Sequence, residues 1–456
     1  MNRSKGRIYE VILLFAVFVV ANVMGANFQK RISYHDGKGW EGVAYTQVAE
    51  QFAQHKPIIG EAPMVYRVGT PFLVSKISPN NLFRGFVIVN LFANFVSLAL
   101  LIVWLRLYLT NWKIRTALGL MFVLQWDTPT RWLWFYPAHT DPMLWVFLLG
   151  GLILLNRLQN LELHGSPRPL LVGLCALSFF GVLFREVAII IPLVLLFVYN
   201  PLTKMEGIAE TLKAILRPKL VYFAPLLWGL LALVILKKSV SQEAGFSFFG
   251  TARHWAYAKP VLTYIHALFL AFGPVLFVLL YRWRSARSFL RAHQFMAVYL
   301  LFFAVMGYLG GTDTERLLYW SMPVVFVLLG RALEDCKSLL TPALVLALLV
   351  SAQLLASRAL MLTPDYTEGR VSHSIPIFTP MGRNAYFMDL FSFHGTPTVE
   401  LISFLEYLVF GILLFEWFQY RRRALSKTRK VIYEKAVVQK VVSVSDHTAK
   451  PEKVEA

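Results

Sequence analysis

Long apolar runs alternate with short polar connections along almost the whole chain. A spanning helix takes about 20 apolar residues, and about twelve runs approach that length. The pattern therefore predicts an all-α polytopic integral membrane protein with about 12 transmembrane helices (range about 10–13), in which the shorter runs form tilted or incomplete helices. The predicted spans are 8–26, 83–107, 116–126, 141–158, 169–184, 187–200, 220–238, 261–281, 294–309, 317–333, 338–357 and 399–418.

Composition agrees with this pattern. Hydrophobic residues make up 57% of the 456 residues and charged residues only 16%, whereas soluble domains have about 45–50% and about 25%. The two cysteines, Cys175 and Cys336, lie in or beside apolar segments and are too few for a disulfide framework or a zinc site. A soluble enzyme, a disulfide scaffold and a disordered protein are thereby excluded.

The N-terminal run has two interpretations. Arg3, Lys5 and Arg7 precede the apolar run 8–26, an order that also begins a cleaved signal peptide. The run is long for a signal peptide, and no small-x-small cleavage site follows it. We therefore expect a first spanning helix that is retained.

The net charge of +19 raises the question of a nucleic-acid partner. With the N-terminus inside, about 28 of the 45 Lys and Arg residues fall on the inner side, as the positive-inside rule requires. The net charge is then about +17 inside and about +3 outside, with runs at 282–291 and 421–423 as the clearest markers. The excess of positive charge on the inner side predicts cytoplasmic N- and C-termini and contact with membrane lipids. We therefore expect no nucleic-acid partner.

The spans define the domains. Residues 1–418 form the transmembrane domain, with long outer loops at about 27–82 and about 358–398 on the same face. Residues 201–219 form a short amphipathic inner connector. Residues 419–456 form a basic cytoplasmic tail, partly disordered.

The first outer loop carries two acidic residues, Asp36 and Glu41, beside glycines at positions 37, 39 and 42 that free the backbone of the turn. From Val43 the pattern becomes helical, which predicts an amphipathic helix along the membrane surface with its apolar stripe toward the lipid. Arg67 follows and returns the chain toward the same surface.

This loop resembles a known family. Trp40-Glu41-Gly42-x-x-Tyr45-x-x-Val48-Ala49 is similar to the Trp-Asp-Gly-x-x-Tyr-x-x-Ile-Ala stretch of many GT-C glycosyltransferases, and Tyr66-Arg67-x-x-x-Pro71 resembles the segment that follows in bacterial members. The resemblance implies a polytopic enzyme that uses a polyprenyl-phosphate sugar on the outer or lumenal face, with a catalytic acidic residue in this loop. Because Glu41 stands where Asp is usual, either Glu41 or Asp36 is the candidate.

Sugar transfer from a lipid phosphate needs one base for the acceptor hydroxyl, and cations or donors around the phosphate. Arginine holds phosphate with paired hydrogen bonds, and three arginines lie at outer helix ends. These are Arg67, Arg185, which precedes Glu186 between two apolar runs, and Arg316, which ends the Gly310-Gly311-Thr312-Asp313-Thr314-Glu315 turn. We expect Arg185 to contact the lipid phosphate and Glu186 to orient it. Solvated loop acids, a self-compensating Arg185–Glu186 pair and a plain capped turn are the structural alternatives.

Two further segments are ambiguous. Asp141, after His139 and Thr140, begins a span and either complements the helix dipole or contacts substrate. The aromatic run 131–136 suits a sugar face, but an interfacial aromatic belt is the preferred interpretation.

The sequence therefore predicts a membrane glycosyltransferase (inverting, hexosyl- or mannosyltransferase-like), in a bacterial cytoplasmic membrane with its site facing outside. Its partners would be a lipid-linked sugar donor and a glycan, lipid or protein acceptor. An O-antigen-type polymerase or ligase, and a lipid-linked sugar flippase or secondary transporter, are the alternatives. No zinc-type cluster occurs, although Asp36 or Glu41 could hold Mg²⁺ or Mn²⁺. The expected substrate-binding residues are Tyr45, Tyr66, Arg67, His139, Asp141, Arg185, Glu186, Asp313 and Arg316.

Overall fold

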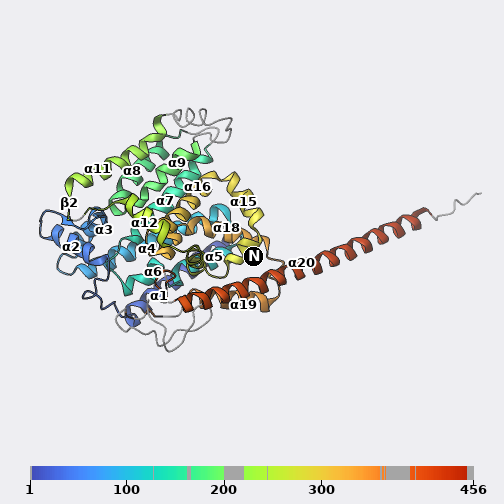
Figure 1. The fold of residues 1–456 in the computed structure, drawn as a ribbon. Helices are drawn as coiled ribbons and strands as arrows, with labels where there is room; N and C mark the ends of the chain where they lie inside the picture. The colour runs from blue at the N-terminus through green and yellow to red at the C-terminus, as the bar shows by residue number, and fades with distance from the viewer. Residues whose placement is uncertain are drawn as a thin grey trace, which may run out of the picture.

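The computed structural model describes residues 3–126, 128–161, 166–199, 220–243, 245–359, 362–363, 365, 391–395 and 397–448. These residues are nearly all helical, as the apolar pattern predicts, and form a bundle of packed helices with one long helix that projects from it (Figure 1). The elements are α1 (Arg3–Phe28), α2 (Gly42–Ala53), β1 (Ile59–Gly60), η1 (Met64–Tyr66), α3 (Gly69–Ile77), α4 (Leu82–Tyr108), α5 (Trp112–Leu124), α6 (Pro129–Phe135), α7 (Asp141–Gln159), α8 (Arg168–Phe184), η2 (Glu186–Ile189), α9 (Ile190–Tyr199), η3 (Leu220–Phe223), α11 (Ala224–Ser239), β2 (Ser241–Gln242), α12 (Phe248–Ala258), α13 (Val261–Phe272), α14 (Leu276–Tyr281), α15 (Trp283–Ala292), α16 (Gln294–Leu309), α17 (Thr314–Tyr319), α18 (Met322–Asp335), α19 (Ala343–Ala356) and α20 (Pro397–Thr448).

The all-α membrane architecture is confirmed, and the helices are shorter and more broken than the sequence predicts. Within the described residues, five helices are long and apolar enough to cross a membrane, or six if α15 and α16, bent by 115°, form one span. Four further apolar helices are shorter. The five are Lys5–Phe28, Leu82–Tyr108, Asp141–Gln159, Val221–Ser239 and Pro397–Thr428. Twelve spans stay a prediction.

Two expected spans are divided by identifiable residues. The run 261–281 becomes α13 and α14 because Gly273, at φ 77°, ends the first helix and Pro274 follows it. The run 317–333 becomes α17 and α18, and Pro323 lies in the first turn of α18, where a missing amide proton costs nothing. Apolar runs alone do not reveal such breaks.

The two ends of the bundle differ in their elements. In Figure 1, α2, α3 and the two short strands lie at one end, and the N-terminus and α15 lie toward the other, where α20 leaves the bundle. β1 pairs in parallel with β2, and Tyr66 donates a hydrogen bond from its hydroxyl to Gln242 at 2.7 Å. These contacts fasten the first loop to the segment that follows α11.

The helix expected from Val43 is α2, but its apolar stripe packs on protein. Tyr45 and Ala49 are fully buried against Val74 of α3 and Phe86 of α4. The stripe therefore covers neighbouring helices instead of lying on lipid as expected. Neighbouring apolar side chains remove it from water as completely as a bilayer would.

A buried carboxylate in α1 contacts two arginines at the other end of the bundle. Glu10 is fully buried and contacts Arg115 at 2.7 Å and Arg106 at 3.1 Å. A buried charge is tolerated where it is paired and hydrogen-bonded in this way. These two ion pairs connect α1 to α4 and α5.

The C-terminal segment is helical on both sides of the expected boundary near 418, and the division into a transmembrane domain and a tail stays a prediction. α20 is one helix of 52 residues that continues to Thr448. The expected inner connector 201–219, most of the outer loop 358–398 and the end of the tail after 448 lie outside the described residues.

Candidate functional site

The turn before α2 is built on left-handed backbone. His35 and Asp36 have φ near 50° and 55°, and Gly37 and Gly39 have φ of 85° and 71°. A side chain at Gly39 would overlap the ring of Tyr136. The amide of Gly42 donates to the Tyr136 hydroxyl at 2.6 Å. The turn is thus pressed against Tyr136, which fixes the position of Glu41.

Glu41 lies between two arginines from distant parts of the chain. Its Oε2 is 3.5 Å from Nη1 of Arg67, and its Oε1 is 3.3 Å from Nη2 of Arg316. The Tyr45 hydroxyl, one helical turn later, donates to Oε2 at 3.1 Å. The carboxylate that the motif singles out is therefore held by cations on both sides.

Arg67 is the most tightly held of the arginines. Its Nε and Nη2 make paired hydrogen bonds with Glu186, at 2.9 and 2.6 Å, and its Nη1 donates to Tyr45 at 2.5 Å. The sequence suggested that Glu186 orients its neighbour Arg185. In the structure Glu186 orients Arg67 instead, because η2 turns the two adjacent side chains in different directions.

Arg185 and Arg316 complete the group. Arg185 is buried, forms an ion pair with Asp141 and lies over the ring of Trp320, 4.7 Å from its centroid. Arg316 contacts Asp313 at 2.7 Å and Asp141 at 3.8 Å. We refer to these residues as the charge cluster: Glu41, Arg67, Asp141, Arg185, Glu186, Asp313 and Arg316.

The charge cluster controls the ionisation of its members. Burial would raise the pKa of Glu41, but Arg316, Arg67 and Arg185 outweigh burial and hold that pKa well below its usual range. Burial and the neighbouring Arg67 lower the pKa of Arg185 to about 10, so Arg185 stays protonated at neutral pH. Glu41 is therefore ionised throughout the neutral range.

A cavity of about 420 Å³ adjoins the charge cluster and includes Glu41, Asp141, Asp313 and Arg316 in its wall. His139 also lines the cavity, where burial lowers its pKa to about 4, with a smaller effect of Arg316 and Arg185, so the imidazole is neutral. Much of the remaining wall is aromatic. Those residues are Trp40, Trp132, Tyr136, Trp145, Tyr319, Trp320 and Phe391. Trp132 and Tyr136 belong to the run interpreted as an interfacial belt, and the structure places them in this cavity.

Two of the predicted residues lie apart from the charge cluster. Asp36 is exposed in the turn, five residues before Glu41. Tyr66 is half-buried and directs its hydroxyl to Gln242. Of the other predicted residues, Tyr45 contacts the charge cluster, His139 lines the cavity beside it, and the rest belong to it.

Two residues that the sequence did not single out support the site, one in the cavity wall and one behind the turn that carries Arg316. Glu315 lines the wall beside Arg316. Lys259 is buried and donates from Nζ to the carbonyl oxygens of Gly307 and Gly311, at 2.8 and 2.7 Å. Lys259 thereby anchors the Gly-rich turn before Arg316. Glu315 belongs to the turn that the sequence singled out and could have been selected there. Lys259 could not have been selected, because it lies 52 positions before its partner Gly311.

Asp36 and Glu41 are the candidate ligands for a divalent cation. In the parts of the chain that the structure describes, no three His, Cys, Asp or Glu side chains are grouped as metal ligands. Both oxygens of Glu41 already face guanidinium groups, and Asp36 lies outside the charge cluster. A divalent cation at Asp36 or Glu41 therefore stays a prediction.

Comparison with known proteins supports the architecture. No protein-family model and no curated protein matches the sequence. Among solved structures, the chain is similar to the crystal structure of ArnT from Cupriavidus metallidurans bound to undecaprenyl phosphate, with a TM-score of 0.50 and 16% sequence identity over 91% of this chain and 78% of that one. This similarity shows that the chain shares the fold of the ArnT structure, in agreement with the GT-C-like fold that the first-loop motif predicts.

Proposed function

We propose that this protein is a membrane glycosyltransferase that moves a sugar from a polyprenyl-phosphate donor to an acceptor at the outer face of a bacterial cytoplasmic membrane. The main support for the proposal is the position of Glu41, which lies between Arg67 and Arg316 at the wall of an aromatic-lined cavity. The ArnT structure, whose fold the chain shares, contains undecaprenyl phosphate.

The charge cluster supplies the groups that this reaction needs. Glu41 takes the proton of the acceptor hydroxyl while the acceptor oxygen attacks the anomeric carbon from the face opposite the phosphate, so the configuration inverts. The bond from that carbon to the phosphate oxygen breaks, and Arg316 and its neighbours stabilise the charge left on the phosphate.

The low pKa of Glu41 is compatible with its role as a base. In the substrate-free protein, Arg316 and Arg67 lower that pKa. A bound phosphate adds negative charge beside the same arginines, which weakens their attraction for Glu41 and raises its affinity for a proton. The donor therefore prepares the base for the acceptor.

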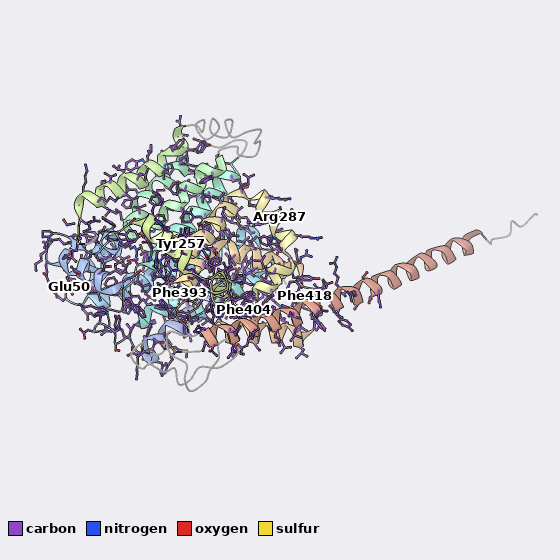
Figure 2. All side chains as sticks on the ribbon, in the orientation of Figure 1. Glu50, Tyr257, Arg287, Phe393, Phe404 and Phe418 are labelled. Carbon is purple, nitrogen blue, oxygen red and sulfur yellow. The ribbon has the colours of Figure 1, made fainter. Side chains whose placement is uncertain are left out.

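The central experiment compares Glu41→Gln with Glu50→Gln. Glu41 precedes the first residue of α2, and Glu50 is exposed on the same helix, away from the charge cluster (Figure 2). Glu50 is therefore the control position. We expect Glu41→Gln to lower kcat by about 10²- to 10⁴-fold, and Glu50→Gln to retain full activity. The assay follows sugar transfer from short-chain polyprenyl-phosphate sugars to membrane acceptors by purified protein in lipid nanodiscs.

Three outcomes oppose the proposal. Full activity in Glu41→Gln, with normal protein levels, excludes Glu41 as the base. Translocation of the lipid-linked sugar across sealed vesicles without transfer identifies a flippase, and extension of a lipid-linked glycan by whole repeat units identifies a polymerase. Because the arginines of the charge cluster supply positive charge for the phosphate, we also expect the transfer rate to survive EDTA. Loss of transfer in EDTA would support a divalent cation at Asp36 or Glu41.

A further inference from the structure

The cavity has two chemically different sides because of one short helix. Glu315 and Arg316 are adjacent in α17, so their side chains diverge by about 100° around the helix axis. Arg316 faces the charge cluster, and Glu315 faces the segment 391–395, where its Oε1 accepts a hydrogen bond from the backbone amide of Ser392.

The Glu315 side has unused hydrogen-bonding groups. Glu315 is 2% exposed and Ser392 is 1% exposed, yet Oε2 of the first and the hydroxyl of the second complete no hydrogen bond within the described residues. The indole Nε1 of Trp132 is buried and also unpaired in this part of the chain. Burial raises the pKa of Glu315. Glu315 and Trp132 line the cavity, whereas Ser392 only follows the lining residue Phe391. Buried polar groups are normally paired, so the unpaired atoms of Glu315 and Trp132 at the cavity wall indicate a missing ligand.

Aromatic rings stand beside these polar groups. Trp132 lies 6.4 Å from both Trp40 and Phe391, between ring centroids, and Tyr136 lies 5.6 Å from Trp40. Flat apolar faces next to hydroxyl-binding groups suit a sugar ring, which has apolar C–H faces and polar edges.

The cavity is large enough for a sugar. Its volume of about 420 Å³ lies within the range of about 300–1,000 Å³ that is typical of small-molecule sites.

We propose that Glu315 binds a hydroxyl group of the donor's sugar, held in this cavity, and determines which sugar the donor carries. Trp132 provides a neighbouring hydrogen bond, and the aromatic rings contact the face of the sugar. This inference rests on the proposed glycosyl transfer and assigns Glu315 a role in substrate binding that is separate from the base Glu41.

The test uses decaprenyl-phosphate monosaccharides that differ in ring size and hydroxyl configuration, together with deoxy analogues of each accepted donor. Glu315→Ala removes the carboxyl group, Glu315→Gln keeps a hydrogen-bonding group of similar size, and Glu61→Gln changes an exposed carboxyl in the first loop as the control. The measured quantity is kcat/KM for each donor and variant.

We expect Glu315→Ala to lower kcat/KM for the preferred donor about 10- to 100-fold, mainly through KM. For one deoxy analogue, which lacks the hydroxyl that Glu315 binds, wild type and Glu315→Ala become equal. Glu315→Gln recovers part of the loss, and Glu61→Gln behaves as wild type. An equal loss with every donor and analogue overturns the assignment, because a merely structural role would lower all rates alike.

Failure of the two proposals can be told apart. Transfer activity with unchanged donor selectivity in Glu315→Ala and Glu315→Gln overturns this inference alone. Inactivity of the wild type with every donor counts against glycosyl transfer. In that case, the fluorescence of the cavity tryptophans measures binding of the same donors. Sugar-dependent binding that Glu315→Gln weakens still supports the inference, and binding that Glu315→Gln leaves unchanged overturns it.

Discussion

Every guanidinium group of the charge cluster is in contact with a carboxylate before any substrate binds. Four carboxylates surround three arginines, so the charge cluster has a net charge of −1 when all are ionised. An incoming phosphate must compete with these carboxylates for the arginines. The arrangement holds the arginines in place without substrate, and the phosphate reorganises existing pairs instead of ordering free side chains.

Acid stability reports the ionisation of Glu41. Its pKa is lower in the folded protein than its usual value of 4.5, so the unfolded chain binds the proton more readily and stability decreases as pH falls. Between about pH 5 and pH 2, wild type should lose up to about 1.4 kcal/mol per pH unit relative to Glu41→Gln. Paired thermal-unfolding curves from pH 7 to pH 3 measure this difference, and parallel curves would contradict it.

The buried pair of Arg185 and Asp141 should matter more for stability than an exposed pair. Their side chains are 3% and 8% exposed, so Asp141→Asn leaves a buried charge without its main partner and should cost about 3–5 kcal/mol. The pair of Arg282 and Asp335 is 40% and 36% exposed, and Asp335→Asn should cost less than about 1 kcal/mol. Denaturant unfolding in detergent compares the two variants, and equal losses would contradict the prediction.

At the scale of elements, the turn before α2 depends on glycine. Gly39 has φ 71°, and a methyl group there would overlap Tyr136, so Gly39→Ala should cost about 1–3 kcal/mol and lower activity by displacing Glu41. Gly229 is the control because it lies within α11 and an added methyl group meets only ordinary contacts. Gly229→Ala should keep or raise the melting temperature. A stable, fully active Gly39→Ala variant would show that the turn does not constrain Glu41.

Local patterns predicted the elements and part of the site. The helix α2 follows from residue spacing, and the proximity of Glu41 to Arg67 follows from the Trp-Glu-Gly and Tyr-Arg motifs in one loop. The partner of Glu186 was not predictable, because Arg67 lies 119 positions away and adjacency favoured Arg185. The divided spans at Gly273 and Pro323 were also missed, since hydropathy averages over single helix-breaking residues.

At the scale of the whole molecule, distant segments meet at one end of the bundle. Arg316 reaches Glu41 across 275 positions of sequence, and Lys259 anchors the turn that carries Arg316. The sequence predicted that these outer helix ends share a face, because spans alternate in direction. The sequence could not predict the cavity, because the aromatic residues of the cavity wall come from segments that are far apart in the chain.

Membrane orientation is the property that joins the fold to the proposed chemistry. Glu50 on α2 and Arg287 on α15 are both exposed and lie toward opposite ends of the bundle (Figure 2). The basic residues at 282–291 predict a cytoplasmic position for α15, and therefore an outer position for Glu50 and the charge cluster. In a variant whose native cysteines Cys175 and Cys336 are replaced by serine, Glu50→Cys should react with a membrane-impermeant maleimide added to spheroplasts. Arg287→Cys should react only after the membrane is opened. The reverse pattern would place the cavity in the cytoplasm, where an acceptor outside the cell could not reach Glu41.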